Sequence, residues 1–432
     1  MCYVACAKVP PWPVLRAPTD SMPQHYDSLE ARDPGERERL LMTALSGQIA
    51  HAKRRAPGWA RILAEVDPAG VTSRAALAKL PVTRKSDLVE LQRAERPLGG
   101  LNATLAQLGK VFVSPGPIYE PEGRGRDWWR TARALFAAGF RPGDVAVNTF
   151  AYHLTPAGSM LESGALALGC TVVPTGTGQT EMQAATIADL RASAYIGTPS
   201  FLKLIVEKAD ELKADIRSLI KAAVGAEYLP PALRAAMAER GIRVLQSYAS
   251  ADLGLIAYES EAFEGMILDE ALILEIVRPG TGDLVTEGEV GEVVVTSFNP
   301  DYPLIRFGTG DLSAILPGPS PCGRTNTRIR GWMGRADQTT KVKGMFVQPS
   351  QVAEIARRHK EILKARLVVD NPGGTDRMTL QCEIRDTPPA GLAQAIGESI
   401  RSIAKLRGEV AFRKPGELPN DGRVIEDAKK YE

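Results

Sequence analysis

The first part of the chain is patterned as helix. Apolar residues such as Leu45 and Ile49 recur at helical spacing, while acidic and basic residues alternate on the remaining face. This periodicity predicts helix through residues 30–66. The following segment, 80–88, is patterned as a turn that enters a short helix, for which Ser86 is the expected N-cap.

From about residue 111 the pattern changes to short β-branched runs that alternate with helical stretches. Alternation of this kind predicts an α/β fold built on mostly parallel sheets. Ligands of such sheets bind beyond the carboxyl ends of the strands, so we expect functional residues in the loops that follow them. The predicted strands are 111–113, 145–149, 171–173, 195–197, 222–224 and 243–245, and the predicted helices are 127–140, 158–168, 180–191, 200–212 and 231–240.

The pattern changes again near residue 265. Two β-branched runs, 272–277 and 292–296, flank the turn-rich segment 279–283, which predicts antiparallel strands and a β-rich subdomain. After Gly331 the pattern predicts a smaller α/β unit. Its expected elements are a helix near 350–358, strands at 365–370 and 378–384, a helix at 390–406 and a last strand at 409–413.

These patterns divide the chain into three parts. Residues 1–23 read as a leader that we expect to be disordered, residues 24–335 as a large N-terminal domain, and residues 336–432 as a small mobile C-terminal domain. A chain of 432 residues buries most of its apolar surface without disulfide support.

Composition narrows the function classes. Lys and Arg total 53 and Asp and Glu total 51, so the formal charge is +2 with both signs spread along the chain. Nucleic-acid binding needs a concentrated basic surface, and this balance argues against it. No run of 18 apolar residues occurs, so no membrane span is expected. Five scattered cysteines without a CxxC pair, four histidines without metal-ligand spacing and no convincing export signal favour a cytoplasmic protein.

The most informative motifs lie within residues 296–349, where four of them follow one another. They are Pro303-Leu304-Ile305-Arg306-Phe307-Gly308-Thr309-Gly310-Asp311, Cys322-Gly323-Arg324-Thr325, Gly334-Arg335-Ala336-Asp337, and Lys341-Val342-Lys343-Gly344 ahead of Pro349. Their order and spacing resemble the phenylacetate–CoA ligase family of the adenylate-forming superfamily. Further matches at 84–88, 97–100, 174–181, 197–200 and 225–227 extend the resemblance over roughly residues 24–427.

The resemblance implies an ATP-dependent ligase that activates an aryl or arylacetic acid. In that family the carboxylate attacks the α-phosphate of ATP to give acyl-AMP and pyrophosphate, and the thiol of coenzyme A then displaces AMP. The expected cofactors and co-substrates are therefore ATP, Mg²⁺ and coenzyme A. The expected partner is a small carboxylic acid, and the resemblance suggests a homodimer.

Family motifs also assign roles to nucleotide-binding residues of this chain. Asp311 would accept hydrogen bonds from the ribose hydroxyls, because a carboxylate has room for both. Tyr248 would stack on the purine, and Asp252 would approach Mg²⁺ with a catalytic role; a helix N-cap before Leu253 is the other interpretation of Asp252. The remaining expected contacts are Gly225, Ala226 and Glu227 at the purine, Ser250 near phosphate, Ser247 elsewhere on the nucleotide, Arg335 as a support of the nucleotide, and Asp337 as the hinge.

The acyl and coenzyme A sites are assigned in the same way. Phe150, Tyr152, His153 and Ala249 match residues that line the acyl pocket of the family, although aromatic residues here are also consistent with core packing. The loop from Lys341 to Gly344 would swing toward the active site, and Gly344 would leave room for the pantetheine arm.

Two departures from the family pattern affect function. The family has a Ser/Thr/Gly-rich phosphate loop that ends in Lys-Pro, but residues 114–123 of this chain hold three prolines, Glu120 and Glu122, and no lysine. Ser114 and Gly116 remain the expected nucleotide contacts in this loop. Near the C-terminus, Arg423 stands where the family places the lysine that assists adenylation, and arginine is bulkier and forked.

These departures leave two other functions open. The chain is either an acyl-CoA ligase, an adenylate-forming enzyme that uses another acyl acceptor, or a catalytically silent nucleotide-binding homologue.

Overall fold

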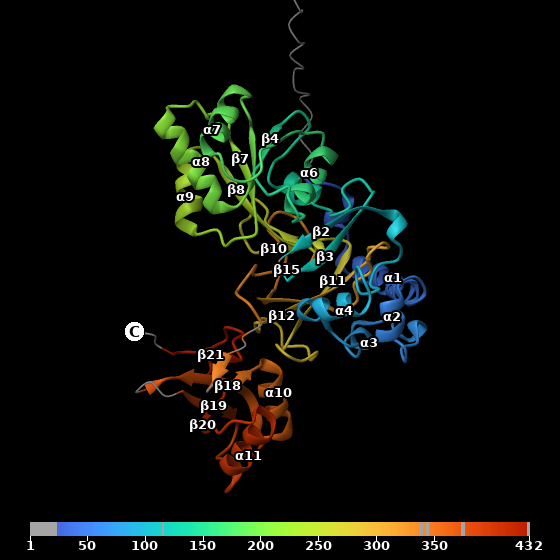
Figure 1. The fold of residues 1–432 in the computed structure, drawn as a ribbon, viewed down its shortest axis with the longest axis vertical. Coiled ribbons are helices and arrows are strands. Elements are labelled where there is room, and N and C mark those ends of the chain that lie inside the picture. The colour runs from blue at the N-terminus through green and yellow to red at the C-terminus, as the bar shows by residue number, and fades with distance from the viewer. Residues whose placement is uncertain are drawn as a thin grey trace, which may run out of the picture.

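The computed structural model describes residues 24–114, 116–336, 338, 340–342, 345–372 and 376–429. Figure 1 shows two bodies, a large one formed by the N-terminal and central parts of the chain and a smaller one formed by its last part. Among the described residues, no helix is long and apolar enough to cross a membrane.

A helical layer forms the N-terminal part, as the sequence predicted. The expected helix is divided into α1 (Pro34–Arg55) and α2 (Pro57–Ile62), because a proline at the start of each helix fixes where it begins. The prediction of Ser86 as an N-cap was wrong: the Asp87 side chain accepts the Arg84 backbone N–H instead. Shorter elements complete this layer, namely η1 (Ser28–Ala31), η2 (Pro68–Gly70), α3 (Arg74–Leu77), β1 (Thr83–Arg84), η3 (Lys85–Asp87), α4 (Leu88–Ala94) and η4 (Leu105–Gln107).

The predicted parallel sheet is present as the larger part of a nine-stranded sheet of order β14-β15-β10-β9-β8-β7-β6-β4-β5. Its parallel strands are β4 (Val145–Asn148), β5 (Thr171–Pro174), β6 (Ala194–Gly197), β7 (Lys221–Val224) and β8 (Arg243–Ser250). The helices between them are α6 (Ala157–Ala167), α7 (Thr180–Asp189), α8 (Pro199–Leu212) and α9 (Pro231–Glu239), while the helix expected at 127–140 is reduced to α5 (Ala132–Ala137). This arrangement brings the loops that follow β7 and β8 side by side.

The strand expected at 111–113 lies outside this sheet. It belongs to β2 (Leu108–Ser114), which pairs antiparallel with β3 (Ile118–Gly123) in a two-stranded sheet. The prediction that it joins the parallel series was therefore wrong, because the chain turns back after Ser114 instead of crossing through a helix.

The β-rich subdomain that the second change in pattern predicted is present in the structure. Antiparallel strands β11 (Leu272–Val277), β12 (Gly291–Ser297) and β13 (Phe307–Ser313) form one sheet, and β1 joins β13 in parallel. The remaining strands of the larger sheet are β9 (Gly254–Tyr258), β10 (Met266–Leu268), β14 (Ile315–Leu316) and β15 (Arg328–Ile329). Strand β13 thereby lies beside an N-terminal segment that is more than 200 positions away in sequence.

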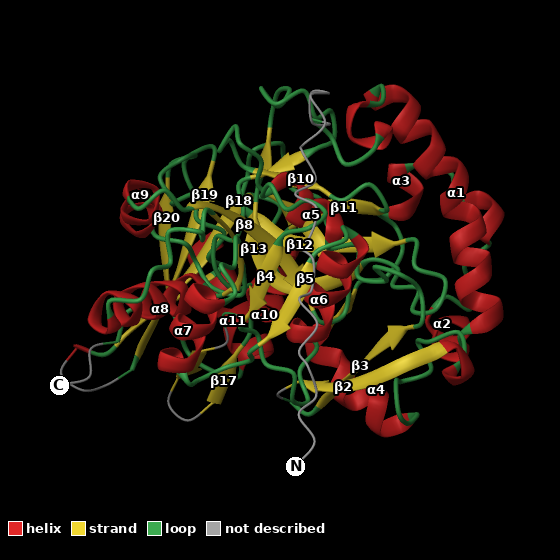
Figure 2. Ribbon diagram, turned by 90° about the horizontal axis from the view of Figure 1, so that it is seen from above, coloured by secondary structure: helices red, strands yellow, loops and turns green. Residues whose placement is uncertain are grey.

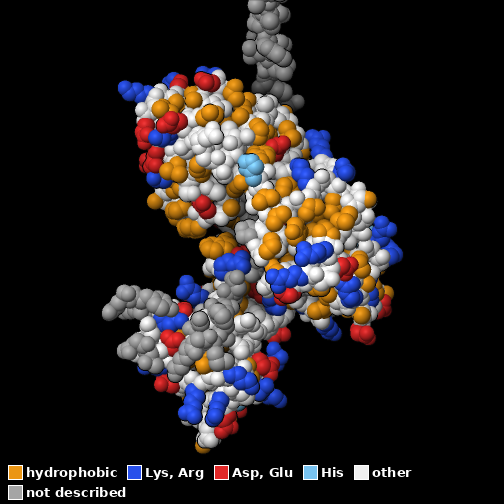
Figure 3. All heavy atoms as spheres, viewed as in Figure 1, with side chains coloured by type: hydrophobic (Ala, Val, Ile, Leu, Met, Phe, Trp, Pro, Cys, Tyr) orange, Lys and Arg blue, Asp and Glu red, His pale blue; other side chains and the backbone are white. Residues whose placement is uncertain are grey.

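The last part of the chain has its own sheet, of order β20-β19-β18-β21, and its own apolar cluster. Helices α10 and α11 pack with this sheet, as Figures 1 and 2 show. Its elements are β16 (Thr340–Val342), β17 (Met345–Val347), α10 (Pro349–Arg358), β18 (Ile362–Asp370), β19 (Arg377–Ile384), α11 (Leu392–Ala404), β20 (Glu409–Arg413) and β21 (Ile425–Asp427). The domain boundary at 335/336 stays a prediction. Figure 3 shows acidic and basic side chains interspersed over the visible face of both bodies.

Candidate nucleotide site

Asp311 on β13 is the centre of a polar group that we call the Asp311 cluster, together with Tyr248, Trp332 and Arg335. The Tyr248 hydroxyl donates to Asp311 Oδ2 at 2.9 Å. The indole Nε1–H of Trp332 and Nη1 of Arg335 both donate to Oδ1 at 3.0 Å. The carboxylate is thus held by three donors from two different parts of the chain. Burial, followed by the charge of Asp311, raises the pKa of Tyr248 well above its ordinary value.

Backbone geometry explains why these residues meet. Gly310 has a φ of 75°, a conformation that glycine adopts easily, and a Cβ there would lie 2.7 Å from Arg335 Nη2. The Ala336 N–H donates to the Gly310 carbonyl at 2.7 Å, and Asp311 forms an isolated bridge with Arg335. The Thr-Gly-Asp and Gly-Arg motifs are therefore neighbours in space as well as in sequence.

Beside the Asp311 cluster lies a cavity of about 190 Å³. The loop after β7 and the carboxyl-terminal half of strand β8 supply most of its walls, which is the edge where ligands of a parallel sheet are expected. The structure brings together five sequence-predicted nucleotide residues around it, and Ala249, which we expected at the acyl pocket, lines it too. The lining residues are Ala226, Glu227, Tyr228, Gln246, Ser247, Tyr248, Ala249, Met266, Asp311 and Trp332.

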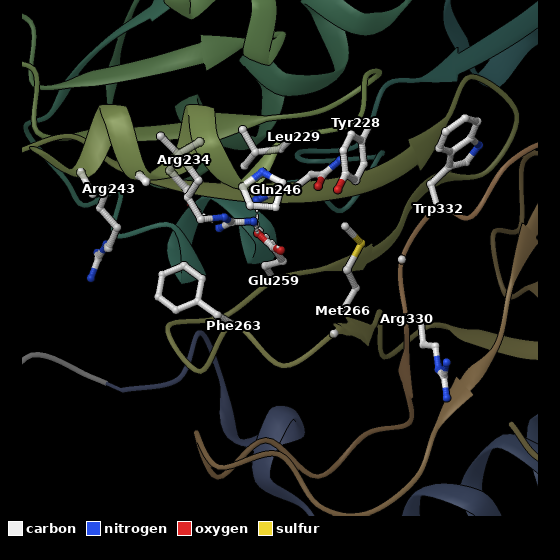
Figure 4. Close-up of a pocket in the computed structure, with 16 residues that line it drawn as sticks. Tyr228, Leu229, Arg234, Arg243, Gln246, Glu259, Phe263, Met266, Arg330 and Trp332 are labelled. Atoms are coloured by element: carbon white, nitrogen blue, oxygen red, sulfur yellow. Dashed lines mark hydrogen bonds and ion pairs between the residues drawn. The ribbon is translucent and has the colours of Figure 1, made fainter. Parts of the chain in front are cut away.

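A second cavity, of about 560 Å³, adjoins the first. Tyr228, Gln246, Met266 and Trp332 line both cavities, and Figure 4 labels all four among the residues around the larger one. The only ion pair drawn in Figure 4 joins Arg234 to Glu259 at 2.7 Å, so these two charges compensate each other. Arg243 and Arg330 also line this cavity, so it combines aromatic and apolar walls with positive charge.

On the other side of the Asp311 cluster, a cleft of about 530 Å³ separates the β-rich subdomain from the start of α10. Lys85 and Arg335 line it and bring positive charge. Ile118, at the start of β3, lines the same cleft, so the hairpin that replaces the phosphate loop does reach it. A nucleotide with its base in the 190 Å³ cavity and its ribose at Asp311 would extend its phosphates in this direction.

Buried acidic residues stand next to Lys85, and we call Lys85, Glu120, Asp252 and Tyr302 the Lys85 cluster. Lys85 Nζ donates to Asp252 Oδ2 at 2.8 Å and lies 3.8 Å from Glu120 Oε1. Neither carboxylate side chain has exposed surface. Burial and then the charge of Asp252 raise the pKa of Glu120 to about 7, although Lys85 and Ser114 partly offset this increase. Burial opposes a charged Lys85, but the neighbouring Asp252 and Glu120 charges raise its pKa overall.

The N-cap interpretation of Asp252 is wrong. No helix follows Asp252, because the chain makes a turn and enters β9 at Gly254. The Leu253 N–H is accepted by the Ser250 hydroxyl at 3.1 Å, not by Asp252. The Asp252 carboxylate therefore points into the Lys85 cluster.

Sequence reasoning assigned no role at the site to Lys85 or Trp332 and saw Glu120 only as a misplaced negative charge. Lys85 belongs to the Arg84–Leu88 match, and its place after β1 was the available signal. Trp332 sits inside the Gly331-Trp332-Met333-Gly334 run beside Arg335. The pairing of β1 with β13 brings Lys85 to the site, and the fold of β3 brings Glu120. Backbone contacts of residues 333–335 with β13 bring Trp332.

The other predicted acyl residues, Phe150, Tyr152 and His153, lie in the loop after β4. Phe150 packs against the apolar cluster of α5 and α6, and the Tyr152 hydroxyl accepts a hydrogen bond from Asn148 Nδ2 at 2.9 Å. His153 is exposed. The Val113 N–H donates to the Leu154 carbonyl at 2.8 Å, so this loop is anchored to the β2 strand. Their role in acyl binding stays a prediction.

Other predicted residues are placed as follows. Ser114 ends β2, Gly116 lies in the hairpin turn, and Gly225 follows β7 with its N–H donated to the Gly197 carbonyl. Arg423 lines a separate cavity of about 50 Å³ between the 278–290 turn and α10, so the structure does not bring it to the Asp311 cluster. The predictions for Asp337, Gly344 and the Lys341 side chain lie outside the described residues.

No group of three or more His, Cys, Asp or Glu side chains in the described part of the chain is arranged to hold a metal ion. Asp252 Oδ1 is buried and has no hydrogen-bond partner, however, so one carboxylate oxygen at the phosphate end is available to a cation.

Known proteins resemble this chain over most of its length. A family model described as AMP-binding enzyme matches residues 127–299. A phenylacetate-coenzyme A ligase from Aromatoleum evansii is 30% identical over 419 residues, which cover 91% of this chain and 94% of the relative. One from Thermus thermophilus is 30% identical over 402 residues, which cover 88% and 89%.

A solved structure of a 2-hydroxyisobutyryl-CoA ligase, in an open conformation with 2-HIB-AMP and CoA, has the same fold. The TM-score is 0.70 at 23% identity, over 94% of this chain and 93% of that chain. The predicted adenylate-forming fold is thereby confirmed. On the evidence of its relatives, this chain belongs to the phenylacetate–CoA ligase family.

Proposed function

We propose that the protein is an ATP-dependent acyl-CoA ligase that activates an aryl or arylacetic acid, as its phenylacetate-coenzyme A ligase relatives are named to do. The observation that supports this most strongly is the Asp311 cluster, which joins a purine-sized cavity to a cleft that holds Lys85 and Arg335. This arrangement fits a nucleotide that is bound at both its base and its phosphates.

Each group has a role that follows from its chemistry. The Asp311 carboxylate accepts the ribose hydroxyls, and the Tyr248 ring forms one wall of the purine cavity. Lys85 and Arg335 stabilise the charge on the phosphates as the acid attacks the α-phosphate and pyrophosphate leaves. The thiol of coenzyme A then attacks the acyl carbon and AMP leaves.

Mg²⁺ fits the phosphate end of this site. It is commonly bound through one or two carboxylates together with substrate phosphates and water, and Asp252 offers a buried oxygen without a partner. Bound there, the ion would neutralise phosphate charge.

The proposal is tested by incubating the purified protein with ATP, Mg²⁺, coenzyme A and a panel of acids that includes phenylacetate, benzoate and 2-hydroxyisobutyrate. The expected result is the matched release of AMP and acyl-CoA with at least one aryl or arylacetic acid. If neither product forms with any acid, the proposal fails.

The structure of the phosphate end supports a second candidate, adenylation with an acyl acceptor other than coenzyme A, or nucleotide binding without turnover. Glu120 places a buried carboxylate where the family pattern has Lys-Pro, and Arg423 lies in another cavity. Acid-dependent exchange of pyrophosphate into ATP without consumption of coenzyme A would favour another acceptor. A rise in melting temperature with AMP, but no exchange, would favour a silent homologue.

A further inference from the structure

Four buried oxygen atoms in the Lys85 cluster take part in no hydrogen bond. They are both carboxylate oxygens of Glu120, Oδ1 of Asp252 and the Tyr302 hydroxyl. Tyr302 is 1% exposed, and burial, followed by the charges of Asp252 and Glu120, raises its pKa well above the ordinary value. Buried polar atoms are normally paired, so the three unpartnered carboxylate oxygens of Glu120 and Asp252 beside Lys85 indicate that a ligand belongs there.

The charges of the cluster do not balance. Glu120 and Asp252 bring two carboxylates, and Lys85 is the cation in contact with them. Its ammonium donates to Asp252 Oδ2 but lies too far from Glu120 Oε1, at 3.8 Å, for a hydrogen bond. Buried charges need both a counter-charge and hydrogen-bonding or coordinating partners, whereas Glu120 has a counter-charge only at 3.8 Å, beside Ser114, which also lowers its pKa.

We propose that Glu120 and Asp252 together bind one divalent cation directly, through these unpartnered oxygens, before a nucleotide arrives. Carboxylate oxygens are the ligands that Mg²⁺ and Mn²⁺ prefer, and water or phosphate oxygens complete their coordination. The inference deepens the proposed function, on which it rests, by adding Glu120 as a second protein ligand.

This site accounts for the altered phosphate loop. Glu120-Pro121 ends the 114–121 run where the family pattern has Lys-Pro, so the sequence change by itself reverses the charge there. A cation held by Glu120 restores positive charge at that position. The backbone donors that Pro115, Pro117 and Pro121 remove are then less necessary, because a metal ion contacts phosphate oxygens in their place.

The test uses the full-length protein without nucleotide and Mn²⁺ alone as the probe, with binding followed by the loss of the free Mn²⁺ signal in electron paramagnetic resonance. We expect one Mn²⁺ per chain, displaced by Mg²⁺. Glu120→Gln should weaken binding by at least about tenfold, because it removes an ionised ligand. Absence of binding by the wild-type chain, or binding that Glu120→Gln does not weaken, would overturn the proposal.

Glu122→Gln is the matched control. Glu122 lies two residues away on the same strand, but its carboxylate already contacts Trp129, Ser159 and Lys110 at 2.7–2.9 Å. Its substitution should leave Mn²⁺ affinity unchanged. If it weakens binding as much as Glu120→Gln does, the effect is general to β3 and the proposed site is wrong.

Lys85→Met supplies an opposite expectation. Removing the ammonium takes away a cation that competes for Asp252, so Mn²⁺ should bind more tightly and raise the melting temperature more than in the wild type. Weaker binding in this variant would contradict the proposal. Should any variant fail to fold, Glu120→Asp keeps the charge but shortens its reach, and intermediate Mn²⁺ affinity is expected.

The outcome is separate from that of the proposed function. Glu120-dependent Mn²⁺ binding without any acyl-CoA product would support the metal site and contradict the proposed ligase activity. Acyl-CoA formation without Mn²⁺ binding to the free protein would support the ligase activity and contradict the metal site.

Discussion

The Asp311 cluster and the Lys85 cluster lie on either side of one nucleotide-sized site, yet they differ in how they handle charge. Asp311 is one carboxylate with three donors, two of which, Trp332 and Arg335, are about half exposed. The Lys85 cluster has two fully buried carboxylates and one ammonium in contact with them. The first can exchange its partners for ribose hydroxyls, whereas the second is incomplete without an added cation. Under the proposed function, the nucleoside would therefore be bound as in the family pattern, while phosphate binding would depend on groups that this chain arranges differently.

The largest effect is expected from Asp252→Asn, which should impair the phosphate end of the site while leaving the nucleoside end intact. It removes the charge that pairs with Lys85 and one proposed metal ligand. Pyrophosphate exchange should fall by about 10²- to 10³-fold, the usual cost of losing one preorganised electrostatic contact. AMP affinity, measured by calorimetry, should change little, because the purine and ribose contacts remain.

Asp215→Asn is a suitable control for this substitution, since Asp215 pairs only with the exposed Arg217 in the described contacts. Comparable loss of AMP and ATP binding in Asp252→Asn would show that the two clusters act as one unit and that the contrast between them is false.

Asp311→Asn is expected to act on the nucleoside instead. Asparagine keeps the shape but replaces one acceptor oxygen by a donor and removes the charge that holds Arg335. Affinity for AMP and for ATP should fall together, by about 10- to 100-fold, since hydrogen bonds to a charged group contribute about 1.5–3 kcal/mol.

The control for Asp311→Asn is the same change at Asp283, in the 279–283 turn. A loss of ATP affinity that leaves AMP affinity intact would assign Asp311 to the phosphates and overturn its placement at the ribose.

The sequence predicts a residue of the site well when its position depends on neighbouring residues, and poorly when it depends on contacts between segments far apart in the chain. Tyr248 and Asp311 could be predicted because each sits in a recognisable motif on a strand or directly after it. The parallel strands β4 to β8 were predicted from local β-branched runs, and the helices between them from local periodicity. Such signals depend only on neighbouring residues.

Lys85 could not be placed in the same way. Its position depends on the pairing of β1 with β13, and that of Glu120 on a hairpin whose turn differs from the family loop. Arg306 is the opposite case: it belongs to the most recognisable motif, but it is 1% exposed and pairs with Glu275 at 2.9 Å, so it supports the scaffold and lies outside the nucleotide cavities. A motif identifies the family, while tertiary contacts decide which of its residues face the ligand.

Arg335 lies at both the nucleoside end and the phosphate end of the site, because it pairs with Asp311 and lines the cleft that contains Lys85. Arg335→Gln should therefore weaken ATP binding by about 3- to 10-fold and AMP binding by less, with a smaller difference at high salt, since this side chain is half exposed and its charge is screened. Arg330→Gln, in the neighbouring 560 Å³ cavity, is the control. Equal effects of Arg335→Gln on AMP and ATP would confine Arg335 to the nucleoside.

The smallest effect is expected from Trp332→Phe, and its sign is informative. A carboxylate offers about four acceptor positions, and Tyr248, Trp332 and Arg335 already take three of those on Asp311. Two ribose hydroxyls therefore need at least one donor to leave, and the exposed indole is held by a single hydrogen bond. Phenylalanine keeps the aromatic surface but lacks the N–H, so AMP affinity measured by calorimetry should rise by about 2- to 5-fold, the scale of one modest hydrogen bond.

Tyr228→Phe, which changes another polar aromatic residue of the same cavity without touching Asp311, should leave AMP affinity unchanged. A fall in affinity for Trp332→Phe would instead mean that the indole N–H stays in place and contacts the nucleotide, which would make the Asp311 cluster as fixed as the Lys85 cluster.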